Sequence, residues 1–152
     1  TKINPGGLNG KPVEAIGELG DPMQATVFGM AIGVPDGTEV ILAGGTQMLA
    51  VAALLRHAGY NKSLLVATTT YVVHDKFAQF LDLAKQIDVK IYSAPLDFSR
   101  SRFTGLSDYE KGYVKEGVGA GGAVWYAEQL GVPPERVIKK TEKLYQEMIE
   151  KR

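Results

Sequence analysis

Three short apolar runs, separated by longer segments with helical periodicity, constrain the fold of this chain most. The runs occupy residues 39–43, 63–67 and 89–92. They do not alternate polar with apolar residues, so each predicts a strand that is buried on both faces. Short strands joined by helices of about ten to fifteen residues are typical of crossover units with parallel pairing. The sequence therefore predicts an α/β, Rossmann-like three-layer fold with a mainly parallel sheet and C-terminal helices.

Helix signals fill the segments between and after these runs. Asp21 followed by Pro22 predicts a helix that has Asp21 as its N-cap and ends at Gly33. Further helices are predicted over residues 46–59, 74–87, 123–130 and from 133 to the end, whereas residues 97–115 are polar. Residues 1–19 are predicted to be a linker or an extended N-terminal segment, and residues 20–152 an α/β domain. Three strands make a thin sheet, so we expect this domain to be part of a larger fold.

The composition excludes several classes of function. Lysine plus arginine equals aspartate plus glutamate, 17 each, so no charge excess favours a nucleic-acid or membrane-surface partner. The absence of cysteine excludes disulfides, thiolate zinc sites and cysteine nucleophiles. No apolar run approaches the roughly 20 residues of a membrane span. His57 and His74 have no acidic partners at ligand spacing. We therefore expect a cytoplasmic protein without a metal site.

Residues 116–122, with the sequence EGVGAGG, predict a ligand-binding loop. Glu116 precedes four glycines, and a helix-like run follows them. Glycines let the backbone approach a ligand, the N–H groups at a helix start attract anions, and the carboxylate can act as a general base. The alternative is that the glycines only allow close packing. Residues 117–122 also match the dinucleotide-binding fingerprint G-x-G-x-x-G. That fingerprint must follow a buried strand, and residues 110–115 are too polar to form one.

Two further groups of residues follow strands at the sheet edge where ligands bind in parallel folds. Gly44, Gly45, Thr46 and Gln47 come directly after the first strand, and residues 68–70, all threonine, end the second. Backbone amides and hydroxyls at this edge can hold a phosphate or a carboxylate. The alternatives are an ordinary strand-to-helix connection that Thr46 caps, and β-branched residues that complete a strand.

Three stretches together resemble the nicotinate-nucleotide–dimethylbenzimidazole phosphoribosyltransferase family, in its archaeal and cyanobacterial-type homologues. They are residues 20–24 (GDPMQ), 42–48 (LAGGTQM) and 116–120 (EGVGA). The resemblance implies transfer of a phosphoribosyl group from nicotinate mononucleotide to a benzimidazole-type aromatic base. The product would be α-ribazole phosphate, for the lower ligand of cobamides.

The resemblance also implies roles for individual residues. Glu116 would take the proton from the attacking base, without a cofactor or a metal. The nucleotide would lie beside a set of binding residues: Gly44, Gly45, Thr46, Gln47, Thr68, Thr69, Gly117, Val118 and Gly119.

The resemblance covers the carboxy-terminal half of a typical family member. Nothing here matches the family's further glycine- and threonine-rich segment, which carries another acidic residue. A homodimer, or pairing with the missing N-terminal half, is therefore expected. The alternative function is a non-catalytic nucleotide-binding or interaction module.

Overall fold

A computed structural model describes residues 5–75, 77–113 and 117–151 of the 152-residue chain. Its centre is a sheet of three parallel strands in the order β1-β2-β3, formed by β1 (Val40–Ala43), β2 (Leu64–Thr69) and β3 (Lys90–Ala94). Val66 in the middle strand pairs with Leu42 on one side and with Ile91 on the other. The sheet and its flanking helices confirm the predicted α/β, Rossmann-like fold.

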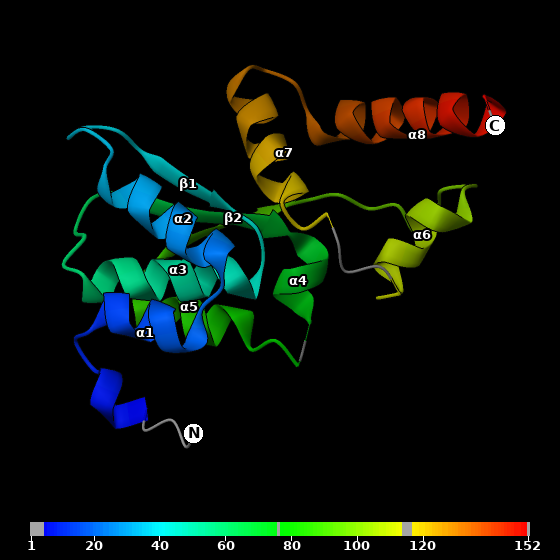
Figure 1. The fold of residues 1–152 in the computed structure, drawn as a ribbon. Helices are drawn as coiled ribbons and strands as arrows, with labels where there is room; N and C mark the ends of the chain where they lie inside the picture. The colour runs from blue at the N-terminus through cyan, green and yellow to red at the C-terminus, as the bar shows by residue number, and fades with distance from the viewer. Residues whose placement is uncertain (1–4, 76, 114–116, 152) are drawn as a thin grey trace.

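Helices cover both faces of the sheet (Figure 1). α3 (Thr46–His57) connects β1 to β2, and α5 (Phe80–Ile87) leads into β3; both lie on one face. α7 (Ala120–Gln129) lies on the opposite face, where it contacts all three strands. α1 (Pro12–Leu19) and α2 (Pro22–Ile32) pack on the outside of α3. The sheet is therefore the middle of three layers.

The main apolar core lies between the sheet and α3. Leu49, Val51 and Leu55 of α3 are at most 2 % exposed and pack in one cluster with Val66 and Phe80. Burying an aliphatic or aromatic side chain of this size stabilises the fold by about 1.5–3 kcal/mol.

A second cluster, formed by Ala94, Leu96, Phe98 and Val124, lies beyond the end of β3. It is covered by Leu106 of α6 (Thr104–Glu110) and by the start of α8 (Pro134–Glu150). The remainder of α8 extends away from the sheet (Figure 1). In the described part of the chain, no helix combines the length and the apolar character that crossing a bilayer requires.

The predicted start of α2 is confirmed in atomic detail. The Asp21 carboxylate accepts a hydrogen bond from the Gln24 amide at 2.8 Å, and the Gln24 side chain accepts one from the Asp21 amide at 3.2 Å. Pro22 occupies the first helical position. This reciprocal capping box satisfies two amides that the helix itself cannot pair.

Two expectations about the amino-terminal side of the chain are corrected. Residues Pro12–Leu19 were predicted as linker or extended segment, but they form α1, preceded by a short 3-10 helix, Pro5–Leu8. α1 packs against α3, and this contact stabilises it. The contact joins two separate helices, so the local sequence of α1 does not predict it. Thr46 was predicted as the cap of α3, but Gly45 holds the N-cap position and Thr46 is the first helical residue.

Two further expectations are corrected on the carboxy-terminal side of β2. The helix predicted over residues 74–87 begins later than expected: α5 starts at Phe80, after Gln79 in the left-handed conformation at φ 45°. A separate short helix, α4 (Thr70–His74), ends where the predicted helix was to begin. The polar stretch 97–115 contains α6. Leu106 and the buried Ser107 anchor α6, so its position comes from the second cluster rather than from local periodicity.

Candidate functional site

The turn after β1 directs the start of α3 toward the carboxyl edge of the sheet. The Gly44 amide still donates to the Ala67 carbonyl of β2 at 3.0 Å, and the Gly45 carbonyl accepts from the Met48 amide at 2.9 Å. The backbone amides of Thr46 and Gln47 lie in the first turn and donate to no described residue, whereas the Gln47 side-chain amide donates to the Asp21 carboxylate at 3.5 Å. They form the positive end of a 12-residue helix, where an anion is stabilised.

The loop before α7 lies against this turn. A Cβ on Gly45 would lie 3.6 Å from Val118 Cγ2, and one on Gly119 would lie 3.6 Å from the Ala43 carbonyl oxygen. Gly117 has a φ of +85°, a conformation that side chains rarely adopt. The structure therefore brings the predicted residues Gly45, Val118 and Gly119 together, although they are far apart in sequence.

The amides at the start of α7 are occupied by the loop itself. Ala120, Gly121 and Gly122 donate to the carbonyls of Gly117, Val118 and Gly119, at 2.8, 3.2 and 3.1 Å respectively. They are therefore not available to an anion in this conformation. This corrects the expectation that the helix start after the glycine loop attracts an anion. The open helix start near the pocket described below is that of α3.

Gly121 and Gly122 allow α7 to pack closely on the sheet. A Cβ on Gly121 would overlap the backbone of Thr68, and one on Gly122 would overlap the Cβ of Ala43. The close-packing alternative therefore explains these two glycines.

A pocket of about 430 Å³, hereafter the first pocket, lies beside the start of α3. It brings together four of the predicted residues with residues of α4 and the turn after it. Its lining consists of Gly45, Thr46, Gln47, Tyr71, Val72, Asp75, Phe77, Ala78 and Val118. No lysine or arginine is among these described residues, and the groups that they offer to an anion are helix amides and hydroxyl groups.

Tyr71, Asp75 and Phe77 are site residues that the sequence did not reveal. The Asp75 carboxylate accepts a hydrogen bond from the Phe77 amide at 2.9 Å, which shapes the turn after α4. The Phe77 side chain is 99 % exposed, so its ring is free at the rim of the pocket. The helix predicted over residues 74–87 places Phe77 on the apolar face that packs on the core. For this reason the sequence did not identify Phe77 as a pocket residue.

The predicted threonines Thr68 and Thr69 do not line the first pocket. They are 0 % and 1 % exposed. The Thr69 hydroxyl is hydrogen-bonded to the Tyr109 hydroxyl at 2.6 Å, and the Thr68 hydroxyl has no hydrogen-bond partner among the described residues. Burial raises the pKa of Tyr109 above its ordinary value. The Thr68 and Thr69 hydroxyls are therefore buried at the end of β2 and do not face the first pocket.

Glu116, the predicted general base, lies outside the described residues. Its role remains a prediction from the sequence. Among the described residues, no three or more histidine, aspartate and glutamate side chains lie together so that they could hold a metal ion.

The chain is similar to proteins named UPF0284, whereas no family model matches it. A UPF0284 protein of Pyrococcus furiosus is 54 % identical over 145 residues, which cover 95 % of this chain and 43 % of that protein. One of Thermococcus gammatolerans is 52 % identical over 149 residues, covering 97 % and 44 %. One of Methanosarcina acetivorans is 48 % identical over 131 residues, covering 84 % and 37 %.

These names overturn the expected membership of the nicotinate-nucleotide–dimethylbenzimidazole phosphoribosyltransferase family. The relatives carry the distinct label UPF0284, and none of the names mentions a phosphoribosyltransferase. The chain spans less than half the length of these curated relatives. What the comparisons show is similarity to part of the UPF0284 proteins.

Proposed function

We propose that the first pocket binds the phosphate and ribose of a mononucleotide. The observation that carries this proposal is the open start of α3, which lines a pocket at the carboxyl edge of an all-parallel sheet. Ligands of open α/β sheets bind at this edge, and helix starts are ready-made sites for phosphate.

The other lining residues suit the remaining parts of a nucleotide. The Thr46 hydroxyl can donate to a phosphate oxygen, as the first-turn amides do. Asp75 offers a carboxylate oxygen that can accept from ribose hydroxyls, beyond the one that accepts from Phe77. The exposed ring of Phe77 offers a face on which a flat heteroaromatic base can stack.

For the complete protein we propose phosphoribosyl transfer from nicotinate mononucleotide to a benzimidazole-type base. A ring nitrogen of the acceptor forms a bond to the anomeric carbon, and the bond to nicotinate breaks with its electrons moving into the nicotinate ring. Glu116 takes the proton of the acceptor, and α-ribazole phosphate is formed for cobamide synthesis. The pyridinium charge of the nucleotide already favours departure, so one base and a held phosphate suffice. Such a base contributes about 10²–10⁴-fold.

A second candidate is a non-catalytic nucleotide-binding module. Two observations favour it. No lysine or arginine is among the described lining residues, and the chain spans only 43 % of the length of the Pyrococcus furiosus relative. A homodimer, or pairing with the rest of the protein, would supply further groups to the site. A cytoplasmic location is part of the same proposal. Formation of α-ribazole phosphate by the complete protein distinguishes the transferase from the module.

The binding proposal is tested by placing a carboxylate on the helix start. In Gly45→Asp the new side chain has room, since a Cβ there makes only ordinary contacts with Val118 and Val72. Aspartate is also a favourable N-cap. Two like charges about 4 Å apart repel by about 4 kcal/mol at an effective dielectric constant of 20, so affinity for nicotinate mononucleotide should fall by more than tenfold.

Isothermal titration calorimetry with nicotinate mononucleotide and with inorganic phosphate measures this loss. Gly45→Ala is the matched control, because it adds the same Cβ without a charge, and its affinity should stay close to that of the wild type. Equal affinities in all three proteins would show that α3 does not hold the phosphate.

A further inference from the structure

We infer that a pocket along the first half of α8, hereafter the α8 pocket, binds the phosphate chain of a small polyphosphate. The α8 pocket has a volume of about 650 Å³. One lining residue comes from the turn after α7 and the others from α8. Its lining consists of Val132, Arg136, Val137, Lys139, Lys140, Thr141 and Lys143. This site is separate from the proposed transfer, because the two pockets share no described lining residue.

Helical spacing gathers four cations on one face of α8. They occupy positions i, i+3, i+4 and i+7, which are neighbours on a helix surface, and all four are exposed: Arg136, Lys139, Lys140 and Lys143. At a rise of 1.5 Å per residue they lie within about 10 Å along the helix axis. No aspartate or glutamate is among the described residues that line the α8 pocket. The pocket therefore presents an anion with several charged N–H donors and no carboxylate.

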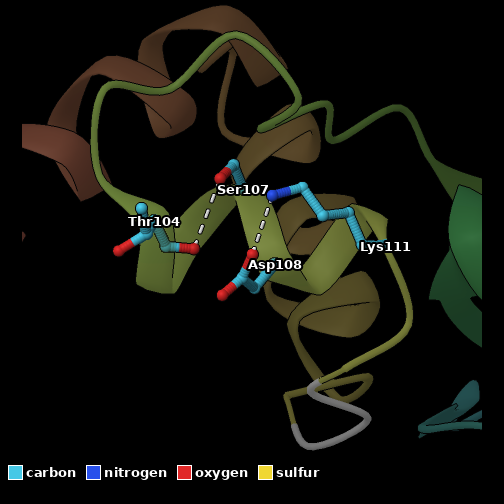
Figure 2. A network of polar contacts seen from close by, with 4 residues as sticks. All are labelled: Thr104, Ser107, Asp108 and Lys111. Atoms are coloured by element: carbon cyan, nitrogen blue, oxygen red, sulfur yellow. Dashed lines mark hydrogen bonds and ion pairs between the residues drawn. The ribbon is translucent and has the colours of Figure 1, made fainter.

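These cations have little charge compensation from the described chain. Other lysines form close ion pairs: Figure 2 shows Lys111 of α6 joined to Asp108 at 2.9 Å. Of the four cations in the α8 pocket, only Lys143 has a described carboxylate within 4.0 Å, that of Glu147 at 3.9 Å. Both partners of that pair are exposed, so it contributes little. Most of the positive charge is therefore left for a ligand.

The position of these charges is unfavourable for the helix itself. Each of the four cations has like-charged neighbours three or four residues away, and such pairs repel. α8 begins at Pro134, so Arg136 lies in the first turn, where the helix dipole disfavours a positive charge. A bound polyanion would offset both effects. Residues that oppose the local preferences of a helix are expected at functional sites.

The extent of the charged face favours a compact ligand over an extended one. One turn beyond Lys143 the same face carries Glu147, and the residues just before Arg136 are two prolines and Glu135. A nucleic acid or a membrane surface would need cations over a longer distance, and the whole chain has 17 positive and 17 negative side chains. Lysine and arginine both bind phosphate groups well. A chain of two or three phosphates matches both the length and the charge of the site.

The test is calorimetric titration of the 152-residue chain with inorganic triphosphate. Lys139→Gln combined with Lys140→Gln removes two of the four charges and keeps good helix formers, so affinity should fall about tenfold. Lys139→Arg combined with Lys140→Arg keeps the charge and should stay within about threefold of the wild type. The matched control is Lys85→Gln with Lys90→Gln, which removes two exposed charges outside the site and should bind as the wild type does. Thermal melting checks that each variant is folded.

Two further titrations identify the place and the source of the phosphate chain. Gly45→Asp, which weakens the first pocket, should leave the affinity of the α8 pocket for triphosphate unchanged. ATP compared with inorganic triphosphate shows whether a nucleoside contributes. Equal affinities mean that the phosphate chain alone is recognised, and tighter binding of ATP means that the ligand is a nucleotide. Either result supports the site, provided that the double glutamine variant weakens binding.

Four outcomes would overturn the inference. They are no binding of triphosphate, equal affinity in the wild type and the double glutamine variant at the α8 pocket, an equal loss in the control variant, and loss of triphosphate binding in Gly45→Asp. The third would mean that only the net charge matters, and the fourth that triphosphate occupies the first pocket. Tighter binding of a single-stranded oligonucleotide than of triphosphate would also reject the inference, and would assign this face of α8 to nucleic acid.

Discussion

At the scale of single residues, the glycines around α7 have two different structural roles: close packing on the sheet and the conformation of the loop. Gly121 and Gly122 lie where α7 touches the sheet, and a Cβ on either would overlap β-strand atoms. Gly119 has ordinary surroundings, and Gly117 has a left-handed backbone. Their sequence, four glycines within six residues, suggested a single ligand-related purpose. Only the distances to the strands separate packing from loop conformation.

The two structural roles predict opposite responses to alanine. Gly121→Ala should lower the free energy of unfolding by about 1–3 kcal/mol or more, because the new Cβ meets the Thr68 backbone, which cannot move aside cheaply. Gly119→Ala is the control and should be neutral or stabilising by up to about 1 kcal/mol, since its φ of −63° suits alanine. Urea unfolding measures both. Similar values for the two variants would contradict the packing assignment.

At the scale of elements, a hydrogen bond across layers joins β3 to α7. The Tyr92 hydroxyl donates to the Glu128 carboxylate. Burial, and then the hydrogen bond and negative charge of Glu128, raise the pKa of Tyr92 well above its ordinary value. Nothing in the local pattern of either element predicts this pair, because its members are 36 residues apart.

Stability should depend on pH through this bond. A raised folded-state pKa contributes stability that is fully present below the unfolded pKa of about 10 and is lost as pH rises above it. Tyr92→Phe should therefore cost about 1 kcal/mol at pH 7, and the difference from the wild type should shrink above pH 10. Denaturant melts from pH 7 to 11 measure it. Tyr126→Phe on the exposed face of α7 is the control, and a constant difference for Tyr92→Phe would refute the coupling.

The elements also show where sequence patterns succeed. Asp21 and Pro22 form the expected start of α2, and Gln24 completes its cap. The start could be predicted because all of its partners lie within one helical turn. The strands were placed correctly because buried parallel strands are apolar throughout. The late start of α5 was missed, since the apolar spacing of residues 77–84 also fits a helix that begins at His74.

At the scale of the whole molecule, the candidate site is assembled from segments that are far apart in the sequence. The first pocket collects groups from α3, α4, the turn after α4 and Val118. No described lining residue is cationic, and the chain spans 43 % of the Pyrococcus furiosus relative. We therefore expect binding and turnover to have different requirements. Under the proposed function, binding should need the start of α3, and turnover should need the complete protein.

This difference predicts the outcome of a turnover assay. The complete protein should form α-ribazole phosphate from nicotinate mononucleotide and 5,6-dimethylbenzimidazole, and the 152-residue chain should bind the nucleotide but form far less product. Glu116→Gln in the complete protein should lower kcat by about 10²–10⁴-fold, the usual contribution of a general base. Glu135→Gln, on the exposed first turn of α8, is the control. Full activity of Glu116→Gln would remove Glu116 from the mechanism.

The sequence by itself determined the fold class, the three strands, the capped start of α2 and the place of the turn after β1. These features depend on residues that are near one another in the chain, so pattern and propensity suffice. Only the tertiary structure decided which glycines pack, that Thr68 and Thr69 are buried away from the pocket, and that Tyr71, Asp75 and Phe77 line it. It also decided that the backbone amides at the start of α3 are open and that those at the start of α7 are hydrogen-bonded to loop carbonyls, among the described residues. The two cases differ only in where the neighbouring carbonyl groups lie. Such contacts join residues that are distant in sequence, and their energies arise only when the layers are packed together.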